Sequence, residues 1–128
     1  MNGGPLSHIK VLDLSRILAA PWAGQIFADL GAEVIKVERP GVGDDTRHWG
    51  PPYLKDKNNQ NTSEAGYFLA VNRGKRSITV SIEKPEGQQI IKDLAIQADI
   101  ILENYKVGTL SKFGLDEVSL RKINPRLI

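Results

Sequence analysis

Positively charged side chains recur where strands are predicted to end and loops to begin. Arg16, Arg39, Lys106 and Lys112 each follow such a strand. The carboxyl ends of parallel strands share one sheet edge, so these cations would converge there. Because arginine forks match phosphate oxygens, the pattern predicts a site for a small polyanion. Arg47, Arg73, Lys75 and Arg76 also lie in or beside a long loop. The competing interpretation is that lysine and arginine simply decorate loops, and for any single one of these residues it is the preferred one.

The carboxylates favour structural roles. Asp44 and Asp45 lie in a glycine-rich stretch. They could be catalytic or bind a metal, but an Asx-capped turn is the preferred interpretation. Glu38 ends a predicted strand, where a dinucleotide-binding fold places a ribose-binding acid. The first strand-to-helix turn lacks GxGxxG, so we predict a solvated carboxylate instead.

Composition removes several classes of function. The chain has 128 residues, no cysteine, and 17 basic against 15 acidic side chains. This excludes thiol nucleophiles and cysteine-bound metals, and the two histidines lie forty residues apart, so no metal site is predicted. A net charge of +2 is too small to indicate nucleic acid. No apolar run approaches a membrane span and no signal pattern begins the chain, so a cytoplasmic protein without membrane contact is expected.

Alternating strands and helices would position these side chains. The predicted strands are 8–14, 33–38, 77–82 and 99–104, with another beginning at 126, and the predicted helices are 19–30, 85–98, 109–113 and 116–123. This order predicts an α/β, Rossmann-like, mostly parallel sheet with flanking helices. The strand at 77–82 alternates polar and apolar residues, so it could instead run antiparallel at an edge. Ala20 is the expected N-cap of the first helix; since alanine cannot cap, either water or a ligand would bind the free N–H groups.

Two features suggest an incomplete domain. Residues 39–76 contain no long predicted element; within them, 55–63 are plainly solvated and 64–72 could form a short buried helix. The sequence stops inside an apolar stretch, Leu127–Ile128, so we expect residues 1–128 to be one truncated segment. Its apolar edge near Ile128 is expected to promote self-association.

Five segments, in the same order along the chain as in a known family, carry a family resemblance. They are LSHIKVLDLSR (6–16), ADLGAEVIKVERPGVGDDTRHWGPP (28–52), NRGKRSITVSIEKPEG (72–87), ADIILENYKVGTLSKFGL (98–115) and INPRLI (123–128). Together they resemble the N-terminal part of family III CoA-transferases, the CaiB/BaiF family. Formyl-CoA and carnitine CoA-transferases belong to it, and α-methylacyl-CoA racemases are related. GDDTRHWGPP is most similar to the succinyl/glutarate branch.

The resemblance implies a CoA site. Its residues here would be Leu18, Ala19, Arg39, Val80, Asn104, Tyr105, Lys106 and Lys112. Leu18 and Ala19 would form the turn that binds CoA, and Arg39 would contact the phosphate region. Two positions depart from the family pattern. Glu83, beside the adenosine end, replaces a lysine and would repel phosphate, and Lys112 replaces a bidentate arginine.

The resemblance also implies chemistry. An aspartate would attack an acyl-CoA thioester, giving a mixed anhydride and CoA thiolate, and CoA would then pass to a carboxylic acid. That aspartate aligns beyond Ile128, so no catalytic residue is assigned here and the isolated chain is expected to be inactive. Family members form interlinked homodimers. The alternatives are a non-catalytic acyl-CoA or nucleotide-binding module and a segment of an α-methylacyl-CoA racemase; the missing glycines disfavour a dinucleotide-binding regulator.

Overall fold

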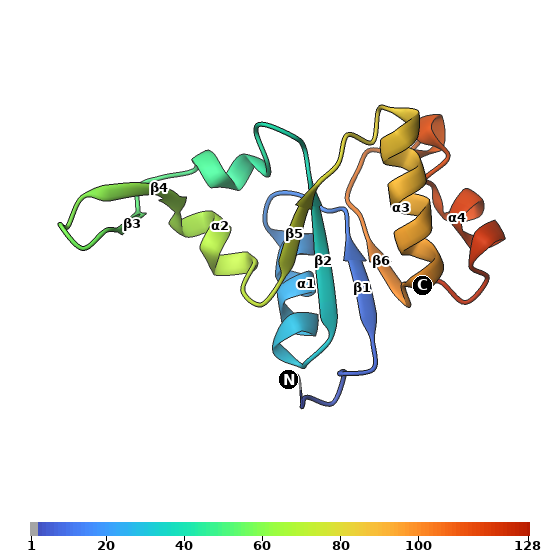
Figure 1. Ribbon diagram of the computed structural model, residues 1–128, viewed down its shortest axis with the longest axis horizontal. Helices are drawn as coiled ribbons and strands as arrows, with labels where there is room; N and C mark the ends of the chain where they lie inside the picture. Colours follow the sequence, from blue (N-terminus) through green and yellow to red (C-terminus); the bar gives the residue numbers. More distant parts are fainter. Residues whose placement is uncertain (1–2) are drawn as a thin grey trace.

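A four-stranded parallel sheet organises the chain (Figure 1). The computed structural model describes residues 3–128. Strands β1 (Lys10–Asp13), β2 (Glu33–Glu38), β5 (Arg76–Thr79) and β6 (Ile100–Leu102) lie in the order β5-β2-β1-β6. The predicted α/β class is confirmed. β5 lies at an edge, but it pairs parallel with β2, so the antiparallel alternative is wrong.

Helices cover both faces of this sheet. On one face, α1 (Ala19–Asp29) packs over a small apolar cluster built on Val11 and Val34. On the other, α3 (Pro85–Gln97), the 3-10 helix η2 (Leu110–Phe113) and α4 (Glu117–Ile123) enclose the larger core (Figure 1). The larger core includes Leu12, Leu14, Val37, Val80, Ile91 and Leu115. Each predicted helix is confirmed to within a residue or two, because the apolar spacing that defines it is strongly periodic.

The segment after β2 forms an arm that projects from the sheet (Figure 1). It contains the 3-10 helix η1 (Asp45–His48), an antiparallel hairpin of β3 (Tyr53–Lys55) with β4 (Asn61–Ala65), and α2 (Gly66–Val71). The short buried helix is confirmed, since Phe68 and Val71 are buried. The hairpin was not predicted because its strands are mostly polar and exposed.

The last residues pair with β6 without forming a regular strand. The N–H of Ile128 donates to Asp99 O at 3.1 Å, and the N–H of Ile101 donates to Ile128 O at 2.8 Å. These bonds have the pattern of a parallel neighbour, as predicted for 126–128, although no strand is assigned there. Leu127 is buried and Ile128 is exposed. Self-association through this edge stays a prediction.

Charged side chains occupy the α1 face at the carboxyl end of the sheet. Strand alternation places Asp13 on the same face as Val11, and Lys36 and Glu38 on the same face as Val34. All three charged residues are buried. The α1 face therefore changes along the strands from an apolar layer to an ionic one.

The Asp13–Lys75 ion pair lies directly against α1. Lys75 Nζ is 2.7 Å from Asp13 Oδ2 and also donates to Pro21 O and Asn72 Oδ1. Both charged side chains are at most 1% exposed. Burial lowers the pKa of Lys75, although Asp13 opposes that effect. A Cβ at position 24 would lie 2.7 Å from Asp13 Oδ2 and 3.0 Å from Lys75 Nζ, so the buried ion pair would have to shift to admit it.

Gly24→Ala is therefore expected to destabilise the protein, by about 1–3 kcal/mol. In an unconstrained helix the same change would stabilise by about 1 kcal/mol. Urea unfolding, monitored by circular dichroism, measures whether the free energy of unfolding falls or rises. Gly3→Ala is the matched control, because open space surrounds Gly3. A more stable Gly24→Ala protein would contradict the close packing of the ion pair on the helix.

Candidate anion-binding cleft

A cleft of about 490 Å³ opens at the carboxyl edge of the sheet. Segments that follow β1, β2, β5 and β6 all contribute to it, as expected for a ligand site in a parallel α/β fold. Its apolar lining includes Leu14, Val37, Val80, Ile82 and Phe113. Its polar lining includes Arg16, Arg39, Asp44, Ser81, Glu83 and Lys84. The volume is in the range typical of small-molecule sites.

The cleft brings together some of the residues expected from the sequence. Arg39, Val80 and Tyr105 line it. The remaining five, Leu18, Ala19, Asn104, Lys106 and Lys112, do not line it. Of the four converging cations, Arg16 and Arg39 reach the cleft, whereas Lys106 lines a neighbouring cavity of about 400 Å³ beside β6 and Lys112 is exposed.

Several lining residues were absent from the predicted set. Arg16 belonged to the cation pattern and could have been included on that ground. Ser81 and Ile82 were missed because the strand was predicted to continue to residue 82, and no sequence signal pointed to Lys84. β5 ends at Thr79, and the chain then turns along the cleft.

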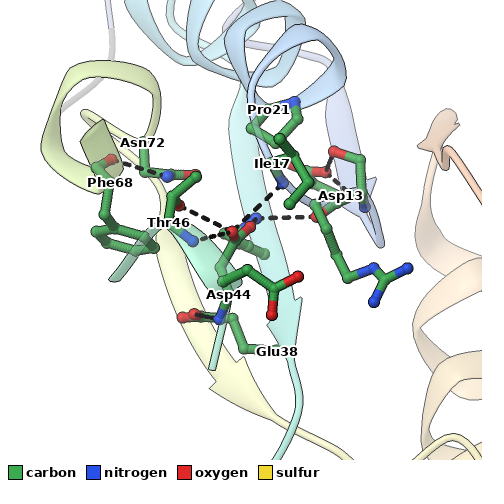
Figure 2. Close-up of polar contacts among 12 residues, drawn as sticks. Asp13, Ile17, Pro21, Glu38, Asp44, Thr46, Phe68 and Asn72 are labelled. Atoms are coloured by element: carbon green, nitrogen blue, oxygen red, sulfur yellow. Dashed lines mark hydrogen bonds and ion pairs between the residues drawn. The ribbon is translucent and has the colours of Figure 1, made fainter. Parts of the chain in front are cut away.

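The turn between β1 and α1 forms one wall of the cleft, and buried side chains hold its backbone. Asp13 Oδ1 accepts from the N–H of Ser15 at 3.0 Å, and Lys36 Nζ donates to Ser15 O at 2.9 Å. Asp44 Oδ1 accepts from the N–H of Ile17 at 3.3 Å (Figure 2). These side chains come from β1, β2 and the loop after β2. The turn is therefore fixed without the glycines of a dinucleotide-binding loop.

Asn104 holds the same turn from the β6 side. Its Oδ1 accepts from the N–H of Arg16 at 3.0 Å, and its Nδ2 donates to Arg16 O at 2.7 Å. Both polar atoms of the amide are thus engaged with backbone. Asn104 links the loop after β6 to the turn after β1.

Ile17 has a left-handed backbone, with φ of 74°. This is a strained conformation for a β-branched residue. It turns the chain so that α1 begins at Ala19 with Leu18 as N-cap, which corrects the expected cap at Ala20. No side chain caps the helix, so the choice between water and a ligand stays open.

Asp44 is a structural carboxylate, as predicted. It caps η1 by accepting from the N–H of Thr46 at 3.0 Å and its hydroxyl at 2.8 Å. Its Oδ2 lies 2.9 Å from Lys36 Nζ, an ionic contact without hydrogen-bond alignment, and both side chains are 1% exposed. Burial opposes the charged form, but the bonds from Thr46 and the Lys36 charge lower the pKa of Asp44 overall.

Glu38 is not solvated, so that prediction was wrong. Its side chain is 2% exposed and both oxygens lie 2.7 Å from nitrogens of Arg47. Ser77 and the N–H of Asp44 also donate to it. Burial raises the pKa of Glu38, but these donors outweigh burial and lower it to about 2. The Arg47 guanidinium stacks 3.7 Å above the Phe68 ring, which ties the arm to this pair.

Two negative findings hold for the part of the chain that the structure describes. Residues 3–128 include no group of three histidine or acidic side chains placed to hold a metal ion. No helix in this range is long and apolar enough to cross a membrane.

We expect the Glu38 network to make stability depend on pH. The folded pKa of about 2 lies below the ordinary 4.5, so the stabilisation is present above pH 4.5 and is lost as the pH falls toward 2. The full contribution is about 3 kcal/mol. The stability difference between wild type and Glu38→Gln should shrink by about 2 kcal/mol between pH 6 and pH 3 in urea unfolding. A difference that stays constant would contradict the role of the charge, and exposed Glu86→Gln is the matched control.

Comparison with known proteins identifies relatives of this chain. The sequence pattern described as CoA-transferase family III matches residues 6–128. The succinate–glutarate CoA-transferase of Agrobacterium fabrum is 53% identical over 124 residues, which are 97% of this chain and 31% of that protein. The human succinyl-CoA:glutarate CoA-transferase is 51% identical over 127 residues, which are 99% of this chain and 27% of that protein.

Solved structures agree with these sequence relatives. A CaiB/BaiF family protein from Brucella suis is 52% identical and superposes with a TM-score of 0.89, covering 98% of this chain and 32% of that one. The chain thus spans between 27% and 32% of the length of these relatives. The match over residues 6–128 shows that the chain belongs to CoA-transferase family III.

Proposed function

We propose that these residues form the CoA-binding portion of an enzyme that transfers CoA between an acyl-CoA and a dicarboxylic acid. The observation that carries the proposal is the cleft at the carboxyl edge of the sheet, which combines an apolar floor with Arg16 and Arg39. CoA offers the matching chemistry, since it carries phosphates and an adenine ring. The succinyl-CoA and dicarboxylate names of the relatives support the choice of substrate class.

Within the proposed site, Arg39, Val80 and Tyr105 contact CoA directly in the cleft. Leu18 and Ala19 contribute the first turn of α1, and Asn104, Lys106 and Lys112 belong to the segments after β6. Glu83 lines the same cleft with a negative charge, as the sequence departure suggested. We propose that it faces away from the phosphates or lowers affinity for them.

The transfer itself needs a nucleophile, which we propose to be a carboxylate outside these residues. Three carboxylates line the cleft in residues 3–128. Glu38 and Asp44 are buried and fully engaged in ion pairs, so neither is free to attack a thioester. Glu83 is exposed and takes part in no ion pair within residues 3–128, so no charged group orients it. The interlinked homodimer, implied by the family resemblance, and the cytoplasmic location, expected from the sequence, are further proposals.

CoA is expected to bind the isolated chain, whereas NAD is not. Binding to the folded state at a hundred times Kd would stabilise it by about 2.7 kcal/mol, which raises the thermal midpoint by several degrees. Isothermal titration calorimetry and thermal unfolding with each nucleotide measure this. A folded chain that gives neither heat nor stabilisation with CoA would show that the site is not preformed. Equal binding of NAD would favour a general nucleotide-binding module.

The isolated chain is expected to show no transferase turnover. The proposed nucleophile lies outside it, and its own cleft carboxylates are occupied or exposed. The measurement is CoA exchange between succinyl-CoA and glutarate, followed by chromatography, with heat-denatured chain as the control. Turnover above that control would contradict this assignment of the nucleophile.

A further inference from the structure

The cations of the cleft region differ in whether they already have an anionic partner. Arg39 Nη2 lies 2.7 Å from Asp45, and Arg47 is bound by Glu38. Arg16 has no carboxylate within ion-pair distance anywhere in residues 3–128. Lys84 also lacks an ion pair, but its side chain is exposed and nothing in the described chain holds it. Arg16 is therefore the half-buried cleft cation whose charge is left for a ligand.

The Arg16 side chain packs against an aromatic ring although it lacks a counter-ion. Its guanidinium carbon lies 5.0 Å from the centre of the Tyr105 ring, a cation–π contact. Its Nε is buried and has no hydrogen-bond acceptor. A buried donor without an acceptor costs about 1–3 kcal/mol. Because Nε is closed to solvent, a ligand in the cleft meets this side chain through its terminal Nη groups.

The backbone beneath this side chain is fixed from both sides. Asn104 binds the N–H and the carbonyl of Arg16, and Asp13 with Lys36 binds the preceding residue, Ser15. The guanidinium thus starts from a rigid turn, which reduces the entropy lost when a ligand binds.

We propose that Arg16 binds a phosphate group of the ligand through the terminal nitrogens of its guanidinium group, and that Asn104 is the positioning residue that holds Arg16 in place. A planar guanidinium fork without a carboxylate partner matches two phosphate oxygens. The proposal rests on the proposed function for the identity of the ligand. The family resemblance implied that Asn104 belongs to the CoA site itself, whereas in this proposal Asn104 acts by holding the turn that carries Arg16.

The test is calorimetric titration of the 128-residue chain with CoA, 3′-dephospho-CoA and inorganic pyrophosphate. Arg16→Met should raise the Kd for CoA about ten- to a hundredfold, the range of a charge-assisted hydrogen bond. Arg16→Lys should recover part of the affinity but not the bidentate contact. Arg126→Met is the matched control for total charge, since Arg126 is exposed outside the cleft, and it should change Kd less than about twofold. Circular dichroism confirms that each variant is folded.

Comparing the Kd values for CoA and 3′-dephospho-CoA shows which phosphate of CoA, the pyrophosphate or the 3′-phosphate, Arg16 contacts. A similar loss for CoA and 3′-dephospho-CoA assigns Arg16 to the pyrophosphate, whereas a loss confined to CoA assigns it to the 3′-phosphate. An unchanged Kd for CoA in Arg16→Met overturns the inference while the proposed function stands. If wild type binds pyrophosphate but not CoA and Arg16→Met loses that binding, the proposed function fails and the anion contact stands. Binding of neither probe by wild type overturns both.

A double-mutant comparison tests the positioning role of Asn104. Asn104→Ala should weaken CoA binding in the wild-type background and have no further effect in Arg16→Met, because it acts through Arg16. An equal loss in both backgrounds would show that Asn104 contacts the ligand itself and would overturn the positioning role.

Discussion

The buried ionic layer at the carboxyl edge of the sheet is the constraint on which the rest of the site depends. Asp13, Lys36 and Asp44 each bind backbone of the Ser15–Ile17 turn, and each also lies in an ion pair. A buried charge that loses its partner costs several kcal/mol, so these residues stabilise the fold only as a set. These contacts make the turn rigid and thereby fix the position of the Arg16 backbone.

The same layer links the two walls of the cleft. Asp44 binds the turn after β1, while its own N–H donates to Glu38 at the end of β2. Glu38 in turn holds Arg47, which stacks on Phe68 in the arm. A displacement of the arm would therefore be transmitted to the cleft along these contacts. A glycine-rich loop obtains a ligand-binding turn by backbone freedom, whereas here polar side chains fix a turn that contains a strained Ile17.

The sequence predicted the elements better than it predicted the environment of their charged residues. β2 was placed at 33–38, because Val34, Ile35 and Val37 form an apolar run. Nothing local indicates that Lys36 and Glu38 are buried, because their partners come from outside the strand. Arg39, Val80 and Tyr105, which the family resemblance selected, line the cleft, and their contact with CoA stays a prediction. Arg16 was not selected, although the cation pattern contained it. The hairpin was missed because polar, exposed strands lack the alternation that predicts them.

Two helices, one on each face of the sheet, pack closely against the carboxyl edge at which the cleft opens. A Cβ at Gly87, in the first turn of α3, would lie 1.8 Å from Ser81 O, in the segment that lines the cleft. Because that neighbour is backbone, a larger residue would have to displace the cleft wall. On the opposite face, Gly24 gives the Asp13–Lys75 pair its room beneath α1. Each helix thus uses a glycine to approach the carboxyl edge, one against the ionic layer and the other against the cleft wall. The close approach of the two helices at Gly24 and Gly87 therefore borders the cleft, and a methyl group added at either position would displace neighbouring groups at the carboxyl edge.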